Sequence, residues 1–281
     1  MIPASFSYVR PSTIDETIAL LTKHGDAAKV LAGGHSLLPA MKLRLAQPGV
    51  LIDIGRVAEL SGIAERDGRL VIGATETHAA VAASRVVAAA CPLLCEVASH
   101  IGDPQVRNRG TIGGSVVHAD PGADWPAAML ALDAELKIAS SRGIRTVKAA
   151  SFFQGMLQTD VKPDELLVDL IVPKTARSVA YVKTDQKASG FALCGVAVVV
   201  DSKAKTVAVG ITGVRSTPYR ATAVENALRG RELTPDAVAA AAALAAKGID
   251  ALSDIHASAE YRVHLTAINT KRAILKACAQ T

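Results

Sequence analysis

Two Gly-Gly turns constrain the fold and the chemistry of this 281-residue chain more than any other feature of its sequence. Gly33-Gly34 follows an apolar run and precedes a helical pattern, so it forms a strand–turn–helix junction. Gly113-Gly114 lies later, between two small hydroxyl residues and after two arginines. Glycine lets a backbone bend and approach a ligand closely, and free N–H groups at a helix start attract phosphate oxygens. Two such turns predict a site for a long ligand with a diphosphate in its middle.

Neither turn carries the fingerprint of a common nucleotide-binding loop. The first reads AGGHSLLP and the second RNRGTIGGS, and neither matches GxGxxG or the P-loop pattern GxxxxGK[ST]. The sequence therefore predicts neither a Rossmann domain nor a P-loop. A single Gly-Gly turn is typical of many ordinary loops, so the prediction depends on the pair. Asp124 follows the second turn and is a candidate acceptor for ribose hydroxyls or a ligand N–H group.

The residues before position 175 alternate short strand-like runs with helical patterns. Apolar β-branched runs predict strands, and apolar residues three and four apart predict helices. Strands are expected over residues 30–31, 50–54, 70–73, 134–139 and 166–172, and helices over 13–23, 39–45, 81–99 and 125–132. Ser12 is the expected N-cap of the first helix, and residues 101–124 are expected to form a loop.

The pattern changes after Pro173. Strands are expected over residues 179–184, 194–201 and 206–213, followed by helices over 221–228, 235–247 and 259–279. Consecutive strands followed by consecutive helices indicate a small α+β domain whose sheet is covered on one face. We therefore place a domain boundary near residue 175.

Composition argues against nucleic-acid binding. Half of the residues are hydrophobic and a fifth are charged, which is typical of a globular protein. Aromatic residues make up only 3% of the chain, too few for a platform that stacks the bases of single strands. The formal net charge of +5 comes from scattered Lys and Arg residues, without a dense basic block.

The cysteines provide no metal site. Cys91, Cys95, Cys194 and Cys278 form no CxxC pair, and no spacing of cysteine with histidine resembles a zinc site. Four such dispersed thiols cannot hold an iron–sulfur cluster, so a cluster that serves this chain would lie on another polypeptide. The N-terminal residues show no apolar signal core, and no apolar run is long enough to span a membrane. We therefore expect a cytoplasmic protein without a membrane span.

His118, Asp120 and Asp124 form an HxDxxxD pattern, which has the residue types of a metal site. Such spacing arises easily by chance, and a hydrolytic metal site usually adds further carboxylates or histidines nearby. We therefore interpret His118 and Asp120 as residues that order the loop, and we predict no metal ligand in this chain.

Two segments carry a specific resemblance. They read AGGHSLLPAMKLRLAQPGVLIDI and IGDPQVRNRGTIGGSVVHADPGADWPAAMLALDAEL. In this order and at this separation they resemble the FAD-binding medium subunit of the molybdenum hydroxylase (xanthine oxidase and carbon monoxide dehydrogenase) family. The resemblance implies an α+β fold: a two-lobed, p-cresol methylhydroxylase-like FAD-binding domain, then a small C-terminal α/β domain of a sheet plus helices. The first domain would span residues 1–175, with its lobes divided near 55–60, and the second, of the carbon monoxide dehydrogenase flavoprotein type, residues 176–281.

The resemblance also implies contacts with non-covalently bound FAD, and no catalytic residue. The residues that would wrap the diphosphate are Ala32, Gly33, Gly34, His35, Ser36 and Leu37, and those that would meet the diphosphate and ribitol from the other side are Thr111, Gly113, Gly114 and Ser115. Ile101 would lie against the flavin ring, and Asp124 would bind the adenosine ribose or the ribitol. Leu167 and Lys187 would lie near the flavin. A covalent bond between His35 and the flavin is the alternative to a loop-shaping role for that histidine.

The function that the resemblance implies is electron transfer. A molybdenum cofactor on a large partner subunit would hydroxylate the substrate, and two [2Fe–2S] clusters on a small partner would relay the electrons. The FAD of this chain would pass them to an external acceptor, within a dimer of heterotrimers. Two alternatives stay open: a stand-alone flavin oxidase or dehydrogenase, and a non-redox nucleotide-binding or scaffolding protein that uses the same turns.

Overall fold

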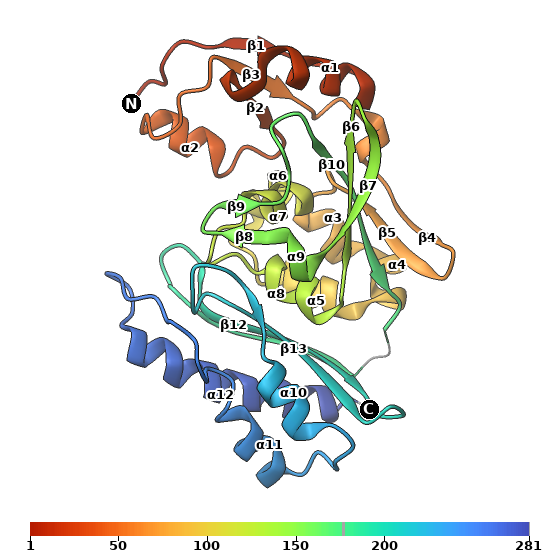
Figure 1. Ribbon diagram of the computed structural model, residues 1–281, viewed down its shortest axis with the longest axis vertical. Helices are drawn as coiled ribbons and strands as arrows, with labels where there is room; N and C mark the ends of the chain where they lie inside the picture. Colours follow the sequence, from red (N-terminus) through yellow and green to blue (C-terminus); the bar gives the residue numbers. More distant parts are fainter. Residues whose placement is uncertain (176–177, 281) are drawn as a thin grey trace.

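Three β-sheets, each with its own apolar core, follow one another along the long axis of the computed structural model (Figure 1). The structure describes residues 1–175 and 178–280. Two short strands form a further small sheet beside the second one. The combination of helices with one parallel and three antiparallel sheets confirms the predicted α+β class.

The first sheet is parallel, with strand order β1-β3-β2. The elements of this lobe are β1 (Ser7–Val9), α1 (Ile14–His24), the 3₁₀ helix η1 (Gly25–Ala27), β2 (Ala28–Leu31), α2 (Leu37–Lys42), β3 (Val50–Asp53) and the 3₁₀ helix η2 (Ala58–Leu60). Thr13, not Ser12, caps α1, because its side chain accepts the Glu16 N–H at 3.1 Å. The Glu16 carboxylate in turn accepts the Ser12 N–H at 2.7 Å. Two adjacent hydroxyl residues precede the helix, and only the second, Thr13, lies three residues before Glu16, whose N–H is capped.

The second sheet is antiparallel, with strand order β4-β5-β10-β6-β7. Its strands are β4 (Ile63–Arg66), β5 (Arg69–Gly73), β6 (Glu135–Ser140), β7 (Gly143–Lys148) and β10 (Leu166–Pro173), and the small sheet consists of β8 (Phe153–Gly155) and β9 (Gln158–Thr159). Leu70, Ile72 and Leu170 face the core shared with the helices of this lobe. Leu166 and Val168 pack instead with the core of the first lobe. The alternating side chains of β10 therefore join the two lobes.

Helices cover the inner face of the second sheet. They are α3 (His78–Ala83), α4 (Arg85–Ala90), α5 (Pro92–Ser99), α6 (Pro104–Arg109), α7 (Ile112–His118), α8 (Trp125–Ala131) and α9 (Ala149–Phe152). The single helix predicted over residues 81–99 is wrong, because the chain breaks twice there. Ser84 caps α4 by accepting the Val87 N–H at 3.2 Å, and Cys91 is non-helical before Pro92. Proline disfavours helical geometry in the residue that precedes it.

The loop predicted over residues 101–124 is also wrong, because it contains α6 and α7. Asp103 caps α6 by accepting the Val106 N–H at 2.8 Å, and Pro104 occupies the first turn. Thr111 caps α7 in the same way, by accepting the Gly114 N–H at 3.1 Å. The low helix propensity of glycine concealed α7, whereas its cap was readable in the sequence.

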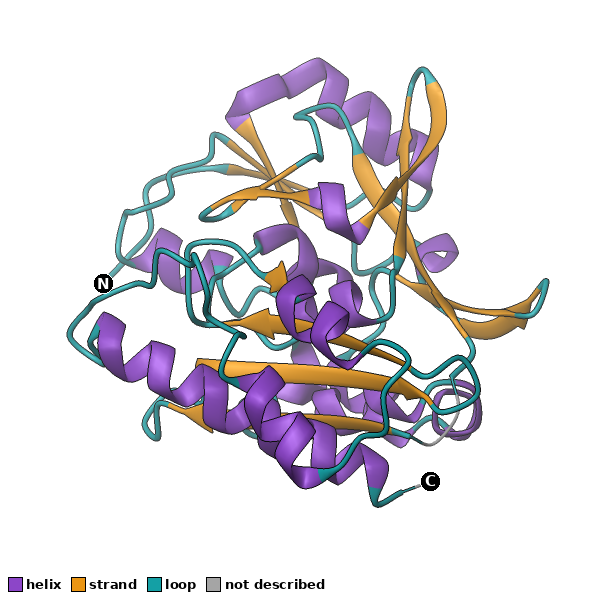
Figure 2. Cartoon of the chain, turned by 60° about the horizontal axis from the view of Figure 1, so that its bottom comes forward, coloured by secondary structure: helices purple, strands orange, loops and turns teal. Residues whose placement is uncertain are grey.

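The third sheet is antiparallel, with strand order β11-β12-β13-β14. Its elements are β11 (Val179–Asp185), β12 (Ala192–Asp201), β13 (Thr206–Thr212), β14 (Tyr219–Arg220), α10 (Thr222–Leu228), α11 (Pro235–Ala242) and α12 (Ala259–Cys278). α12 lies along one face of this sheet, while α5 and α8 pack against the other (Figures 1 and 2). The sheet predicted to be covered on one face is therefore covered on both, and its second cover comes from the preceding lobe. The domain boundary predicted near residue 175 falls between β10 and β11 and stays a prediction.

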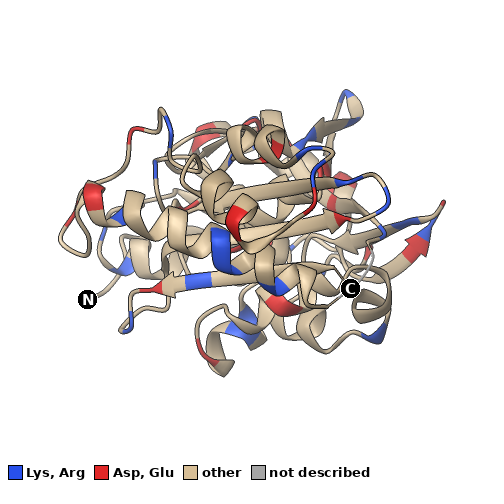
Figure 3. Ribbon diagram, turned by 90° about the horizontal axis from the view of Figure 1, so that it is seen from below, with Lys and Arg blue, Asp and Glu red and all other residues tan. Residues whose placement is uncertain are grey.

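Charged residues of both signs are interspersed over the elements of the molecule (Figure 3). Within residues 1–175 and 178–280, no helix is long and apolar enough to cross a bilayer.

We predict that Gly210→Ala destabilises the fold where β13 packs on α8. A Cβ at Gly210 would lie 2.0 Å from the Ala127 carbonyl oxygen, so the helix and the strand must separate. We expect a loss of about 1–3 kcal/mol in the free energy of unfolding, measured by urea titration. Gly49→Ala is the matched control, because its Cβ would meet nothing closer than 3.7 Å, and its effect should stay within about 0.5 kcal/mol. Equal stabilities of the two variants would contradict this packing.

Candidate functional site

The first Gly-Gly turn joins β2 to α2 and presents unpaired backbone N–H groups. The Gly34 carbonyl accepts the Leu38 N–H at 3.0 Å, and the Ser36 carbonyl accepts the Ala40 N–H at 3.2 Å. The N–H groups of residues 33–36 have no hydrogen-bond partner in the described part of the chain. His35 and Ser36 are exposed, and Gly33 and Gly34 are half-buried. Successive free N–H groups of this kind form a concave site for an anion.

The second Gly-Gly turn is built differently, because its first helical N–H groups are already bonded. The Ile112 N–H donates to the Glu76 carbonyl at 2.9 Å, and the Gly113 N–H donates to the Ala74 carbonyl at 3.0 Å. The Gly114 N–H donates to the Thr111 hydroxyl, as described above. The second turn therefore offers a ligand the hydroxyl groups of Thr111 and the half-buried Ser115. It does not offer free backbone N–H groups at these positions.

The two turns meet by direct backbone contact. A Cβ at Gly33 would lie 2.3 Å from the Arg109 carbonyl oxygen and 2.7 Å from the Gly110 Cα. A Cβ at Gly114 would lie 3.6 Å from the Cβ of Ala32, within ordinary contact. The structure thus brings the two predicted groups of contact residues together, at the junction of the first and second lobes.

A buried histidine supports the second turn from below. The backbone N–H of His78 donates to the Gly110 carbonyl at 3.0 Å. The imidazole Nδ1 of the same residue accepts the Trp125 Nε1–H at 3.1 Å. Burial lowers the pKa of His78 to about 4, so its imidazole is neutral near pH 7. Sequence reasoning missed His78, since a lone histidine at the start of an apolar helix gives no sign of what it supports.

Ile101 lies at the edge of the site, in a turn that an arginine orders. The Arg107 guanidinium donates to the carbonyls of Ile101 and Gly102, at 3.0 and 2.9 Å. Ile101 is half-buried against the apolar core of the second lobe. Arg107 therefore fixes the backbone around Ile101.

Asp124 is buried and is paired with residues from the third sheet. The Tyr181 hydroxyl donates to its Oδ1 at 2.6 Å, and Lys183 Nζ lies 2.9 Å from the same oxygen. Lys183 also donates to the His100 carbonyl at 2.9 Å, next to Ile101. Burial raises the pKa of Asp124, whereas Lys183 and Tyr181 act in the opposite direction. The predicted contact between Asp124 and a ribose or ribitol stays a prediction.

Sequence reasoning also missed Tyr181 and Lys183, although a signal was present. The two residues are two apart in β11 and therefore share one face of that strand. A lysine on the buried face of an otherwise apolar strand indicates a paired carboxylate elsewhere in the chain.

Leu167 and Lys187 lie in different environments. Leu167 is buried in the core of the second lobe, on the strand that packs against α7. Lys187 is exposed in the turn between β11 and β12. That turn comes close to the Ile101 turn, because a Cβ at Gly190 would lie 3.5 Å from the Gly102 Cα. Both assignments stay predictions.

The residues around the two turns fit FAD, the cofactor that the resemblance implies. Four free N–H groups, two hydroxyls and a glycine cradle match an elongated ligand that carries a diphosphate. Residues 31–38 and 110–118 contain no Asp or Glu, whose charge would repel such a ligand, and two arginines precede the second turn.

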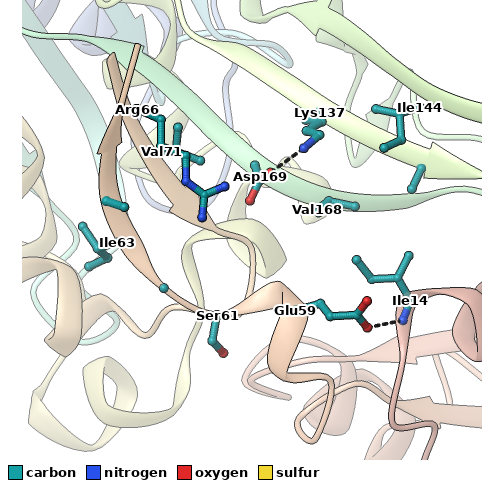
Figure 4. A pocket seen from close by; sticks show the side chains of 13 residues that line it. Ile14, Glu59, Ser61, Ile63, Arg66, Val71, Lys137, Ile144, Val168 and Asp169 are labelled. Atoms are coloured by element: carbon teal, nitrogen blue, oxygen red, sulfur yellow. Dashed lines mark hydrogen bonds and ion pairs between the residues drawn. The ribbon is translucent and has the colours of Figure 1, made fainter. Parts of the chain in front are cut away.

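None of the predicted contact residues lines the groove on the outer face of the second sheet. This groove of about 340 Å³ lies between η2 and the outer face of the second sheet (Figure 4). Lys137 and Asp169, paired at 3.1 Å, line it together with Glu59 and Arg66.

Among residues 1–175 and 178–280, no three His, Cys, Asp or Glu side chains are placed to hold a metal ion. The Asp120 carboxylate instead accepts the Gly122 N–H at 2.8 Å, as a loop-ordering residue would.

Two family models together match nearly the whole chain. The model described as the FAD binding domain in molybdopterin dehydrogenase matches residues 4–175. The model described as the CO dehydrogenase flavoprotein C-terminal domain matches residues 179–277.

Several relatives and solved structures match over nearly their full lengths. The carbon monoxide dehydrogenase medium chain of Hydrogenophaga pseudoflava is 41% identical, over 100% of this chain and 99% of the relative. The nicotine 6-hydroxylase medium subunit of Paenarthrobacter nicotinovorans is 37% identical, over 98% of each. The structure of a carbon monoxide dehydrogenase from H. pseudoflava superposes with a TM-score of 0.96 at 42% identity, over 100% of this chain and 99% of that one. Quinoline 2-oxidoreductase from Pseudomonas putida 86 gives a TM-score of 0.94 at 35% identity, over 99% of each chain.

We predict that His78 makes the fold sensitive to acid. Its pKa is about 4 in the folded chain and about 6.5 when unfolded, so the unfolded state binds a proton first as the pH falls. The contribution of His78 is fully present above pH 6.5 and is lost as the pH falls toward 4, on the order of 3 kcal/mol. His78→Gln should remove this part of the pH dependence, and the exposed His264→Gln should keep it. Urea titrations across this range measure the difference, and parallel curves for all three proteins would contradict the prediction.

Proposed function

Because the chain belongs to the family of FAD-binding medium subunits of molybdenum hydroxylases, we propose that it passes electrons from iron–sulfur clusters on a partner subunit to an external acceptor, through FAD. The family was identified from the two loop segments, and the family models and relatives confirm that resemblance. The observation that most supports a cofactor at this point is the backbone contact between Gly33 and Arg109, which joins the two turns into one site.

The first turn would hold the diphosphate. Residues 33–36 would donate their free N–H groups to its oxygens, with Ala32 and Leu37 closing the two ends of the turn. Backbone N–H donors do not depend on protonation, so binding by this turn would be insensitive to pH. His35 is exposed and makes no hydrogen bond within the described residues, and we assign it a loop-shaping role. FAD would bind non-covalently.

The second turn would bind the diphosphate and ribitol from the second lobe, on the side opposite the first turn. The Thr111 hydroxyl accepts the Gly114 N–H and keeps its own proton for a ligand oxygen, and Ser115 has its hydroxyl available as well. Gly113 is buried, and a Cβ there would lie 2.5 Å from the Ala74 carbonyl oxygen. Its role in this proposal is to let α7 approach Ala74, the residue that follows β5, which places Thr111, Gly114 and Ser115 opposite the first turn.

The remaining predicted contacts would surround the rest of the cofactor. Ile101 would lie against the flavin ring, with its backbone fixed by Arg107. Asp124 would use the carboxylate lone pairs that Tyr181 and Lys183 leave free to bind the ribose or ribitol. Leu167 would act through the packing beneath α7, and Lys187 would approach from the turn between β11 and β12.

The chemistry would come from the cofactor, and the protein would supply binding and orientation. Bound FAD supplies the capacity to exchange electrons singly or in pairs. The two histidines near the turns suit no acid–base step: His78 is buried and accepts the Trp125 N–H, and His35 has no orienting partner among the described residues. We therefore assign no catalytic residue to this chain.

Partner subunits would carry the other redox centres. The relatives are named medium chains or medium subunits, which implies larger and smaller chains beside them. We propose a large subunit with a molybdenum cofactor and a small subunit with two [2Fe–2S] clusters, arranged as a dimer of heterotrimers in the cytoplasm.

We predict that Gly33→Ala weakens FAD binding by about ten- to a hundredfold. The added Cβ would lie 2.3 Å from the Arg109 carbonyl, and relieving a clash of about 1–3 kcal/mol would separate the two turns. Gly49→Ala, which adds a Cβ without a clash, should bind FAD as the unmodified chain does. Equilibrium titration of each variant with FAD, followed by flavin fluorescence, measures the effect. Unchanged affinity in Gly33→Ala would remove the first turn from the site.

We also predict that molybdenum and iron copurify with this chain and its flavin. An affinity tag on the chain, purification from its native cells and elemental analysis measure this directly. The same chain produced alone is the control and should contain neither metal. A flavin-loaded chain that purifies from its native cells as a single polypeptide without these metals would instead support the stand-alone flavoprotein.

A further inference from the structure

The third sheet reaches into the candidate site and grips the segment of residues 121–124 by its backbone. The Gly213 N–H donates to the Pro121 carbonyl at 2.7 Å, and the Ala192 N–H donates to the Gly122 carbonyl at 2.9 Å. The Thr212 hydroxyl lies 2.9 Å from the Pro121 carbonyl oxygen and 2.8 Å from that of Ala123. We call Ala192, Thr212 and Gly213 the backbone clamp. The segment that it grips ends at Asp124, the predicted ribose or ribitol contact.

The clamp residues lie at the end of the sheet, at or beyond the last pair that joins β12 to β13. The pairing of β12 with β13 begins at Gly195 and Thr212. Ala192 and Gly213 lie beyond that pair, and Ala192 is paired on its other side with Asp185 of β11. Both must stay in place to bond neighbouring carbonyls of one segment. An interaction from outside the β12–β13 ladder therefore joins these two strand ends.

Arg262 of α12 supplies that interaction. One guanidinium nitrogen donates to the Leu193 carbonyl at 3.0 Å and to the Gly213 carbonyl at 2.5 Å, so a single group ties the two strand ends. The second terminal nitrogen donates to Asp254 at 2.7 Å. Arg262 is 4% exposed, although it carries a charge. A buried guanidinium is costly unless its donors are used. Both terminal nitrogens of Arg262 donate hydrogen bonds, whereas its buried Nε has no partner among the described residues.

We propose that Arg262 is a positioning residue for FAD. It joins the two ends of the clamp, the clamp fixes residues 121–124, and that segment presents Asp124 to the cofactor. The inference rests on the function proposed above, and it gives α12 and the third sheet an indirect part in cofactor binding, through the segment of residues 121–124. Arg262 itself touches no ligand in this proposal, because it acts through the carbonyls of Leu193 and Gly213.

Hydrogen exchange tests the first step without any flavin. Arg262→Met should speed exchange of the Ala192 and Gly213 N–H groups at least about tenfold in the full chain, because these groups are the donors of the clamp. Exchange in β5 and β10 should not change. Arg272→Met, an exposed position on the same helix, is the matched control and should exchange as the unmodified chain does. Unchanged exchange at both clamp positions in Arg262→Met would overturn the proposal.

FAD titration of the full chain or of its purified assembly tests the second step. Arg262→Met should weaken FAD binding about tenfold and alter the visible circular dichroism of the bound flavin, while Arg262→Lys, which retains a donor, should recover part of the loss. Faster clamp exchange with unchanged FAD affinity and dichroism would mean that Arg262 only stabilises the fold, and would also overturn the proposal.

A second variant keeps the test decisive if Arg262→Met does not fold. Thr212→Val keeps the side-chain shape and removes both hydroxyl bonds to residues 121–124, so it should weaken FAD binding in the same direction. Unchanged FAD affinity in Thr212→Val would overturn the proposal. If the unmodified chain binds no FAD either alone or in its assembly, the proposed function fails. The exchange experiment would then still show whether Arg262 holds the clamp.

Discussion

The backbone contact between Gly33 and the Arg109 carbonyl is the constraint on which the candidate site depends. Any side chain at position 33 would force apart two turns that belong to different lobes. The contact sets the four free N–H groups of the first turn opposite the two hydroxyls of the second turn. The two turns therefore offer a ligand different kinds of hydrogen-bond donor. A diphosphate would therefore bridge the lobes, and its binding would stabilise their arrangement.

The C-terminal sheet contributes more to the site than its place in the sequence suggests. β11 brings Tyr181 and Lys183 to the buried Asp124, and the ends of β12 and β13 grip the segment before it. The Asp124–Lys183 pair is buried, where losing one partner is far more damaging than at the surface. The sheet is thus a layer of the fold that also holds the segment carrying Asp124, the predicted ribose or ribitol contact.

Local signals in the sequence predicted the two Gly-Gly turns, most strands and the final order of strands and helices. Residues 101–124 were misread because glycine concealed α7, although Thr111 and Asp103 are ordinary helix caps. The contacts of His78 with Gly110 and Trp125 could not be read from the sequence, because a tertiary contact leaves no periodic pattern. The same holds for the pairing of Asp124 with Lys183 across distant parts of the chain.

The central claim is that this chain holds FAD non-covalently between its two turns. The most direct test is the absorption spectrum of the chain, purified in its native assembly, before and after acid precipitation. We predict a flavin spectrum whose colour passes entirely into the supernatant as intact FAD. Colour that stays with the precipitated chain would contradict non-covalent binding and indicate a bond to His35. An assembly that is colourless and does not take up added FAD would contradict the flavoprotein assignment itself.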